Sequence, residues 1–166
     1  MAVYNVHERL LPDGAGRLID DLGQIWPEGW PRLRLDRPPA VGAAGGHGPI
    51  RYTVETYVPG EWVRFRVSAP RGLVGFHEFT SHAAPGGTVL RHTIAASLHG
   101  RARLIWPLAI RWLHDAMIED LLDRAELATT GTVAHPSRWS PYVRLLRRRG
   151  GSSNRNLSER PVSARV

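Results

Sequence analysis

The sequence contains no cysteine, and lysine is also absent, so that every positive side chain is an arginine. Without cysteine the chain has neither a disulfide framework nor a thiolate metal site, and nothing in it calls for an oxidising compartment. No segment approaches the ~18 consecutive apolar residues of a membrane span, and the first residues lack the basic start and apolar run of a signal peptide. We therefore expect a soluble, cytoplasmic protein.

The formal net charge of +7 is distributed unevenly along the chain. Residues 1–130 hold 14 Arg against 14 Asp and Glu, whereas residues 131–166 hold 8 Arg against 1 Glu, so the second segment carries 8 − 1 = +7. A nucleic-acid-binding domain usually carries its excess charge on a folded face. This division predicts a neutral folded domain over residues 1–130, no specific nucleic-acid partner, and a disordered Arg-rich tail over 131–166 with a short basic helix at 139–149.

The first third of the chain predicts short elements separated by turns. Residues 3–7 are typical of a strand, and residues 10–25 favour one or two short helices because their apolar side chains recur at helical spacing. Residues 32–36 alternate polar and apolar side chains, which predicts an exposed-face strand. The glycine-rich residues 41–48 predict a flexible connection or a mobile cavity rim, from which His47 could reach an entering ligand.

Two β-hairpins follow in the sequence. Residues 50–56 and 63–67 alternate around the turn at Pro59 and Gly60, and partner numbers that sum to 119 put both apolar sets on one side of the sheet. In that register the pairs are Tyr52 with Val67, Val54 with Phe65 and Thr56 with Val63. Residues 75–81 and 88–98 form the second hairpin, and a partner sum of 169 would place His77 directly opposite His92.

A long helix is predicted over residues 101–130, where no glycine interrupts the chain. Ile110, Leu113, Met117 and Leu121 recur at spacings of three and four residues. Pro107 fits a short lead-in before a main helix from about Trp106, because proline is tolerated in a first helical turn. Gly131 is a plausible C-terminal stop.

This order of elements predicts an α+β domain in which a curved antiparallel sheet wraps one long C-terminal helix, with short helices after the first strand. A curved sheet cannot contact a straight helix along its whole width, so a concave and mostly apolar cavity is expected between them. Strand parity and helix spacing predict its ligand-binding wall: Tyr52, Val54, Phe65, Val67, His77, Phe79, Leu90, His92, Ile94, Ile110, Leu113 and Met117, with His47 at the rim.

Several short motifs resemble those of a known superfamily. Pro49-Ile50-Arg51-Tyr52-x-Val54 leads into the Pro59-Gly60 turn, and Gly75-x-His77-x-Phe79, Gly87-Thr88-x-Leu90-x-His92 and the long helix follow. This pattern over residues 1–130 resembles the START-like superfamily, the SRPBCC group of polyketide cyclases and dehydratases, lipid-transfer proteins and pollen-allergen-type binders. The resemblance implies a helix-grip fold and a hydrophobic ligand. It carries no catalytic signature, and a shared fold does not specify a reaction.

Three side chains are candidate catalytic residues: Tyr52, His77 and His92. Two protonated imidazoles at ~5 Å would repel each other by ~3 kcal/mol, so at least one of the histidines should be neutral at pH 7. The pair could polarise a ligand or shuttle a proton, or its nitrogens could be satisfied within the sheet.

A metal site would need a third ligand from His99, His114 or Asp115, and no motif sets that spacing. We therefore expect no metal and no cofactor. Because neighbouring side chains on a helix diverge by about 100°, surface positions are expected for His114 and Asp115.

The leading hypothesis is binding or carriage of a small hydrophobic molecule, lipid-like or polyketide-like, by a monomer or homodimer. One alternative is a cyclase- or dehydratase-type enzyme that uses the inward-facing tyrosine and histidines. The other is a peripheral membrane or nucleic-acid adaptor, in which the basic tail makes weak contact with an anionic surface.

Overall fold

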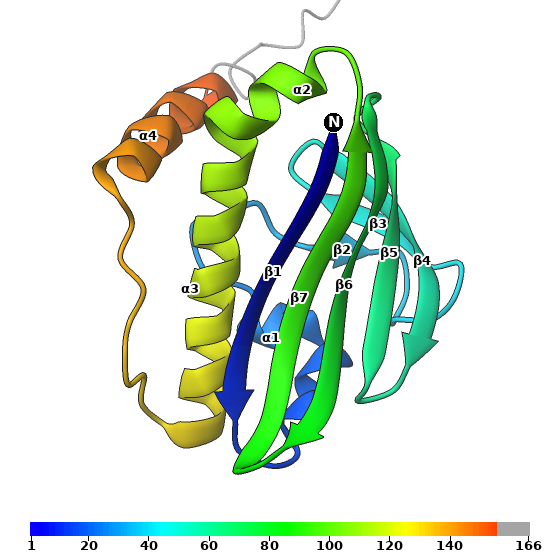
Figure 1. The fold of residues 1–166 in the computed structure, drawn as a ribbon, viewed down its shortest axis with the longest axis vertical. Coiled ribbons are helices and arrows are strands. Elements are labelled where there is room, and N and C mark those ends of the chain that lie inside the picture. The colour runs from blue at the N-terminus through cyan, green and yellow to red at the C-terminus, as the bar shows by residue number, and fades with distance from the viewer. Residues whose placement is uncertain (156–166) are drawn as a thin grey trace, which may run out of the picture.

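The computed structural model describes residues 1–155, with side chains described through residue 148. Its centre is a curved seven-stranded antiparallel sheet that wraps a long helix (Figure 1). The strand order across the sheet is β1-β7-β6-β5-β4-β3-β2. The strands are β1 (Ala2–Leu11), β2 (Arg34–Leu35), β3 (Ala44–His47), β4 (Ile50–Val58), β5 (Trp62–Ala69), β6 (Leu73–Ala84) and β7 (Gly87–Leu98).

The helices form two groups in the chain, one after the first strand and one after the last. Two short ones, η1 (Ala15–Ile19) and α1 (Leu22–Ile25), follow β1, and α2 (Ala102–Ile105), η2 (Trp106–Ile110), α3 (Arg111–Thr130) and α4 (Pro141–Arg155) follow β7. The α+β helix-grip architecture expected from the sequence is therefore confirmed. Within residues 1–155, no helix combines the length and the apolar character needed to cross a bilayer.

β1 is longer than the strand expected at residues 3–7. Its odd-numbered side chains are less exposed than its even-numbered ones from Ala2 to Leu10, the period-two pattern of a strand with one covered face. The strand pairs with β7 along its whole length, with His7 opposite His92. Leu10 and Leu11 therefore belong to the strand, and the helical prediction for residues 10–25 is wrong over its first residues.

The first hairpin keeps the predicted register at two of its three pairs. Tyr52 faces Val67 and Val54 faces Phe65, but a β-bulge after Val54 shifts the rest of β4. Thr56 consequently faces Arg64 instead of Val63. The extra residue of a bulge moves every later pair by one position, which alternation alone does not reveal.

The second hairpin has a shorter turn than expected, and its register changes accordingly. Ala84 pairs with Gly87, so only Pro85 and Gly86 form the turn, and Gly86 adopts a φ of 89°. As a result His77 faces Ile94 and Phe79 faces His92, a shift of two positions from the predicted pairing. A shift of two preserves the face of every side chain, so His77 and His92 stay on the inner face as diagonal neighbours.

Within the glycine-rich residues 41–48, Ala44–His47 form strand β3 where a flexible connection or a mobile cavity rim was predicted. β3 pairs with β4 on one side and β2 on the other. A Cβ atom at Gly45 would lie 2.0 Å from the Arg34 carbonyl oxygen, and one at Gly46 would lie 2.0 Å from the Ile50 carbonyl oxygen. Glycine is therefore required by close backbone approach at the end of a strongly curved sheet.

The long helix begins with a lead-in and ends where expected. α2 continues into the wider π turn η2, which contains Pro107, and regular α-helix runs from Arg111. Gly131 adopts a φ of 77°, and its N–H donates to the Leu127 carbonyl at 2.9 Å. This left-handed residue ends the helix as predicted.

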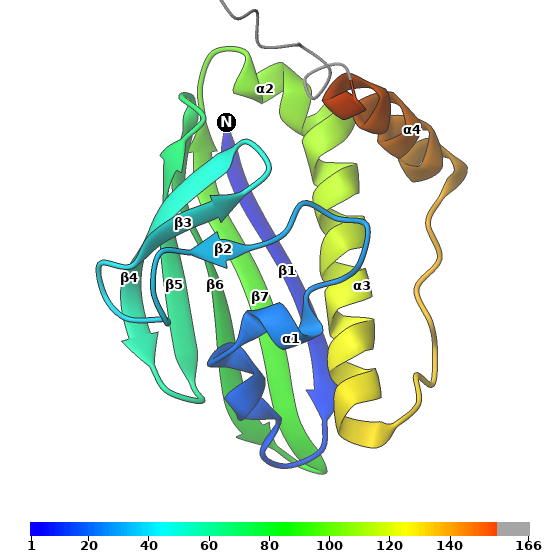
Figure 2. The same ribbon diagram turned by 180° about the vertical axis from the view of Figure 1, so that it is seen from behind.

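Two clusters of buried apolar side chains lie against the inner sheet face, and the larger one fills one half of it. The smaller one lies in the other half and consists of Val67, Leu73, Ile94, Ala96, Leu98 and Trp106. Figure 2 shows α1 lying across the inner face beside the later turns of α3. In this filled half, η1 and α1 contribute Ile19, Leu22 and Ile25, and α3 contributes Leu121 and Leu122. These side chains pack against Tyr52, Val54, Phe65 and Leu90 of the sheet. The other half faces the first turns of α3 and η2, and it is there that space remains.

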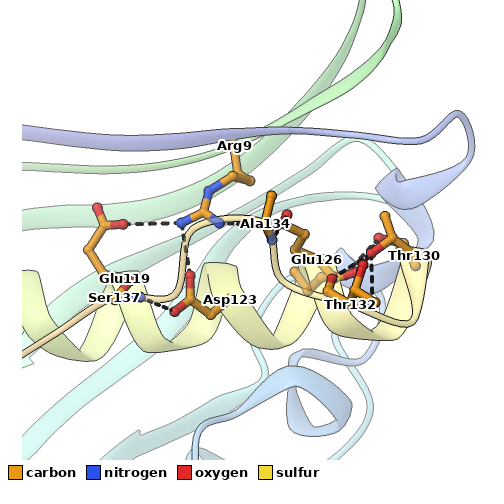
Figure 3. Close-up of polar contacts among 10 residues, drawn as sticks. Arg9, Glu119, Asp123, Glu126, Thr130, Thr132, Ala134 and Ser137 are labelled. Carbon is orange, nitrogen blue, oxygen red and sulfur yellow. Dashed lines mark hydrogen bonds and ion pairs between the residues drawn. The ribbon is translucent and has the colours of Figure 1, made fainter.

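Ion pairs join β1 to α3 along the edge of the sheet (Figure 3). The Arg9 guanidinium donates to Asp123 at 3.0 Å and to Glu119 at 3.4 Å, and it also pairs with Glu126. Three carboxylates on successive turns of α3 therefore hold one arginine of β1. The same carboxylates extend the network to the segment beyond the helix, because Asp123 accepts the Ser137 N–H at 2.7 Å and Glu126 accepts the Ala134 N–H at 2.9 Å.

The segment after Gly131 runs back along α3 to α4 (Figure 1). The Trp139 indole N–H donates to Asp120 on α3 at 2.9 Å, and the Arg147 guanidinium lies 4.0 Å from the Trp139 ring and 4.2 Å from the Trp30 ring. Residues 132–148 are thus fixed to the domain, although a disordered tail was expected from residue 131. The short basic helix expected at 139–149 coincides with the first part of α4, and residues 156–166 of the predicted tail lie outside the described residues.

Candidate functional site

A cavity of about 270 Å³ lies between the unfilled half of the sheet and the helix. Its wall is apolar apart from four histidines. The segment after α1, strands β3 to β7 with the loops before β4 and after β5, and the helix all contribute to it. Its residues are Trp26, Trp30, Pro31, His47, Pro49, Ile50, Val67, Pro70, Leu73, His77, Phe79, His92, Ile94, Trp106, Ile110, Leu113, His114, Met117 and Ile118.

Two groups emerge among the residues predicted to line the cavity. Those in the cavity wall are Val67, His77, Phe79, His92, Ile94, Ile110, Leu113 and Met117, together with His47. Tyr52, Val54, Phe65 and Leu90 are not in this wall, because they pack in the filled half against η1, α1 and the later part of α3. Strand parity placed all of them on the inner face, but it could not show that the short helices cover one half of that face.

Sequence reasoning missed part of the wall. Trp26, Trp30, Trp106 and His114 line the cavity, although none of them was among the residues predicted for its wall. His114 had been expected at the surface, yet its side chain is only 13% exposed. Its position four residues after Ile110 and three before Met117 was the available signal, since both were assigned to the helix face that meets the sheet.

The four cavity histidines form a row across the wall. The ring centroids of His47 and His77 are 6.4 Å apart, those of His77 and His92 are 5.6 Å apart, and those of His92 and His114 are 5.1 Å apart. β3, β6, β7 and α3 each supply one of these rings. The row therefore crosses from one edge of the sheet to the helix.

All four histidines are held in the neutral form at pH 7. Burial lowers the pKa of His47 to about 4 and lowers the pKa values of His77 and His92 well below the ordinary 6.5. Burial also lowers the pKa of His114, although the hydrogen bond to Asp115 opposes it. This agrees with the expectation that at least one of His77 and His92 is uncharged, and the cause is desolvation more than mutual repulsion.

His77 and His92 contact each other through one nitrogen each. His92 Nε2 lies 3.5 Å from His77 Nδ1. Between two neutral imidazoles, one of these nitrogens donates and the other accepts. The donating ring then has an acceptor at its second nitrogen, and the accepting ring has an N–H at its second nitrogen. The pair consequently offers one donor and one acceptor, whichever tautomers are present.

Those second nitrogens, His77 Nε2 and His92 Nδ1, are buried and have no hydrogen-bond partner among the described residues. A buried polar group without a partner costs about 1–3 kcal/mol. The Tyr52 hydroxyl is also buried and has no hydrogen-bond partner among the described residues. Burial raises the pKa of this hydroxyl, so it stays protonated. Its ring lies 5.0 Å from that of His77, but Tyr52 stands behind the cavity wall. The three candidate catalytic residues thus do not form one convergent set.

A charged cluster adjoins the cavity at His114. Asp115 accepts from His114 Nδ1 at 3.4 Å and from His7 Nε2 at 3.2 Å, and His7 Nδ1 donates to Glu119 at 2.6 Å. Burial alone would lower the pKa of His7, but the hydrogen bonds and charges of Asp115 and Glu119 outweigh it and raise the pKa to about 9. The Asp115 pKa, which burial would raise, is lowered by its contacts with both histidines. At pH 7 the cluster therefore holds a charged His7 between two carboxylates.

The same cluster contains the metal-ligand types that the sequence did not place together. Donor atoms of His7, His114 and Asp115 lie within 4.8 Å of one another. Their mutual hydrogen bonds account for this closeness without an ion. His99, the other residue considered as a ligand, is exposed in the turn after β7.

Comparison with known proteins identifies the fold. No protein-family model matches the sequence, and no significant match is found among curated proteins. Among solved structures, CalU16 from Micromonospora echinospora is similar over 96% of this chain and 89% of its own, with a TM-score of 0.55 and 14% identity. The di-domain ARO/CYC protein StfQ of the steffimycin biosynthetic pathway is similar over 79% of this chain and 51% of its own, with a TM-score of 0.61 and 14% identity.

A Thalictrum norcoclaurine synthase in complex with a transition-state analogue is similar over 79% of this chain and 96% of its own, with a TM-score of 0.60 and 8% identity. At these identities the likeness concerns the fold. The helix-grip fold implied by the resemblance to the START-like superfamily is thereby confirmed.

Proposed function

We propose that the chain binds a compact, mostly apolar small molecule in the cavity and holds a polar group of that molecule with His77 and His92. The observation that carries this proposal is the pair of buried, unpartnered imidazole nitrogens in an otherwise apolar wall. Buried polar groups are nearly always hydrogen-bonded, so nitrogens in this position indicate a ligand with matching groups.

The cavity dimensions favour a compact ligand. A volume of about 270 Å³ is close to the lower end of the ~300–1,000 Å³ of small-ligand sites. Such a space suits a fused-ring or aryl molecule better than an extended acyl chain. Trp26, Trp30, Trp106 and Phe79 offer aromatic surface for such rings.

The charge of the wall favours an uncharged ligand. The wall contains no arginine, aspartate or glutamate, and its histidines are neutral. A carboxylate or ammonium group would be desolvated there without a counter-charge. A hydroxyl or a keto–enol group instead matches the donor and acceptor of the histidine pair. Biosynthetic context supports this chemistry, because StfQ, which shares the fold, belongs to the steffimycin biosynthetic pathway.

Two matched ligands test the proposal. 2-Naphthol and 2-methylnaphthalene have nearly the same shape, but only the first can donate and accept a hydrogen bond. We expect the purified chain to bind 2-naphthol about tenfold more tightly, since one satisfied buried group is worth about 1–2 kcal/mol. Replacing both His77 and His92 with Phe should remove the preference while leaving the affinity for 2-methylnaphthalene within a factor of two or so.

A cavity-filling variant provides the second arm. Leu113→Trp places a larger side chain in the wall and should abolish binding of both ligands, whereas Val74→Trp, on the exposed outer face of β6, should not. Circular dichroism checks that each variant is folded. Equal affinity for the two ligands in the unmodified chain, or binding that survives Leu113→Trp, would refute the proposed site. Native mass spectrometry of the purified chain would identify the class of any co-purified molecule.

A second candidate function is a cyclase- or dehydratase-type enzyme, and the histidine pair is the observation that favours it. An imidazole acceptor inside an apolar cavity could remove a proton α to a ketone carbonyl, and the imidazolium could exchange that proton with solvent before it returns one to the carbon. This role is supported for His77 and His92 and not for Tyr52, which lies outside the wall. Proton–deuterium exchange at C1 of 2-tetralone in D₂O, followed by NMR, would be accelerated by the chain and not by the double variant His77→Phe, His92→Phe.

A further inference from the structure

An unusual concentration of large apolar side chains is exposed where the helices meet beyond the cavity. We call it the apolar-basic patch and define it by its exposed side chains: Leu104, Ile105, Leu108, Trp112, Tyr142 and Leu145, with Arg101, Arg103, Arg111, Arg144 and Arg148. Leu104 is 67% exposed and Leu108 is 64% exposed. Single exposed apolar residues are common, but several together mark an interaction surface.

Helical spacing gathers these side chains. Leu104, Leu108 and Trp112 are four residues apart along α2, η2 and the start of α3, so they follow one side of the helix. Trp106, Ile110 and Leu113 of the same segment face the cavity. This part of the helix therefore has one apolar side toward the cavity and a second apolar side toward solvent. The cavity accounts only for the first.

α4 extends the patch and does not cover it. The Tyr142 hydroxyl hydrogen-bonds to the Leu108 carbonyl, and the rings of Trp112 and Tyr142 lie 5.8 Å apart at a steep angle. Figure 1 shows α4 beside the first turns of α3, near α2. Tyr142 and Leu145 remain exposed in this position. Two segments separated by about thirty residues of sequence thus present apolar side chains together.

The charge around these side chains has one sign. The sequence contains no aspartate or glutamate between Glu78 and Asp115, or between Glu126 and Glu159. The patch consequently combines five exposed arginines with six exposed apolar side chains. Arg111 is the arginine with an acidic neighbour on the next turn, Asp115, at 3.6 Å.

We propose that the apolar-basic patch docks on the surface of a bilayer that contains anionic lipids. Leucine and isoleucine can enter the boundary between headgroups and acyl chains, aromatic side chains such as Trp112 and Tyr142 favour that interface, and arginine attracts anionic headgroups. Leucine and isoleucine side chains have no comparable role against a phosphodiester backbone, which argues against nucleic acid.

Self-association is the less favourable use of the same surface. In a two-fold symmetric dimer a patch faces its own copy, so the arginines of one chain would lie against those of the other. An anionic bilayer complements both the charge and the apolar character. The docking does not depend on the ligand proposed for the cavity, although Trp106 and Ile110 place the cavity wall on the inner side of the docking helix.

Vesicle flotation tests the proposal on the full chain. Vesicles of phosphatidylcholine alone are compared with vesicles that also contain phosphatidylglycerol. We expect binding to the anionic vesicles, at least about tenfold weaker binding to the neutral ones, and weakening by salt. The double variant Leu104→Ser, Leu108→Ser should lower binding to anionic vesicles by about tenfold or more, because the apolar contribution is lost.

A matched control distinguishes binding through the patch from non-specific binding through other exposed apolar side chains. Tyr4 and Val74 are also exposed, and the double variant Tyr4→Ser, Val74→Ser should bind vesicles like the unmodified chain. Equal binding to neutral and anionic vesicles, absence of binding, or full binding by Leu104→Ser, Leu108→Ser would overturn the proposal. So would a concentration-dependent dimer that these two substitutions abolish. Affinity for 2-naphthol in solution should be unchanged in the double variant, which keeps this test independent of the cavity.

Discussion

His7 should make the folded state lose stability above neutral pH. Its imidazole lies between Asp115 and Glu119, with Arg9 on the same strand and His114 on the helix as further neighbours. The contacts with the two carboxylates raise the His7 pKa to about 9 from an ordinary value of 6.5. In the unfolded chain the same imidazole is exposed and titrates near its ordinary value.

The sign of the effect follows from proton binding. Between pH 6.5 and about 9 the folded state keeps the His7 proton, whereas the unfolded state has lost it. Stability falls with rising pH wherever the folded state binds more protons. The contribution of His7 is therefore complete below pH 6.5 and is lost as the pH rises through about 9.

The magnitude follows from the size of the pKa shift. A shift from 6.5 to about 9 corresponds to about 3 kcal/mol at ~1.4 kcal/mol per unit. The His7 side chain is only 12% exposed, but its partners Asp115 and Glu119 are partly open to solvent, which screens the interaction. We therefore expect the free energy of unfolding to decrease by about 2 kcal/mol between pH 6.5 and 9.5.

The cavity histidines should produce the opposite slope on the acid side. Burial lowers the pKa values of His47, His77, His92 and His114. Below pH 6.5 these histidines therefore become protonated in the unfolded chain and remain neutral in the folded chain. Their contribution is present above pH 6.5 and is lost as the pH falls. Together the two effects predict maximal stability near pH 6.5–7.

Urea unfolding followed by circular dichroism at a series of pH values measures both slopes. His7→Gln removes the titrating group and should flatten the alkaline slope. It should also lower stability by about 2 kcal/mol at pH 6.5 and by much less at pH 9.5. His135→Gln replaces an exposed histidine outside the cluster and should leave the profile unchanged. An alkaline slope that persists in His7→Gln would refute the assignment of this effect to His7.

Three further predictions concern the core, the helix end and the C-terminal segment. Leu121→Ala, in the filled half, should lower the free energy of unfolding by about 2–5 kcal/mol in urea titrations, and a loss below 1 kcal/mol would contradict full burial. Gly131→Ala should cost about 1 kcal/mol in the same assay, because alanine is strained at a φ of 77°; an unchanged midpoint would argue against the left-handed helix end. Arg147→Ala should raise amide hydrogen exchange in residues 132–140 while leaving β4 unaffected, since the stacking of the Arg147 guanidinium on Trp30 and Trp139 is lost; equal protection in both chains would show that this stacking does not hold the segment.

Much of the fold was predictable because it depends on local periodicity. Alternation along residues 50–56 and 63–67 assigns the inner faces of β4 and β5, and the spacing of Ile110, Leu113 and Met117 predicts the helix that faces them. Gly131 ends this helix for a local reason, its left-handed backbone. The register was less accessible, because the bulge after Val54 and the two-residue turn at Pro85 and Gly86 each shift pairs without changing the alternation.

The site depended more heavily on contacts between distant segments. Strand parity correctly gave His77 and His92 a common face, but the nitrogens they leave unpartnered follow from the packed register. The inclusion of His114 in the wall, and the approach of His7 to Asp115 across more than one hundred residues, follow from how β1 lies against α3. No spacing in the sequence encodes that distance.

The sequence by itself determined which side chains of each strand and helix share a face, because side-chain direction repeats every 2 residues in a strand and every 3.6 in a helix. Only the tertiary structure decided which part of the shared face is core and which part is cavity. That division arises where η1 and α1 fill one half of the sheet and leave the other half to the histidines. Which segment packs on which part of the sheet depends on contacts between distant parts of the chain, and these cannot be read from local periodicity.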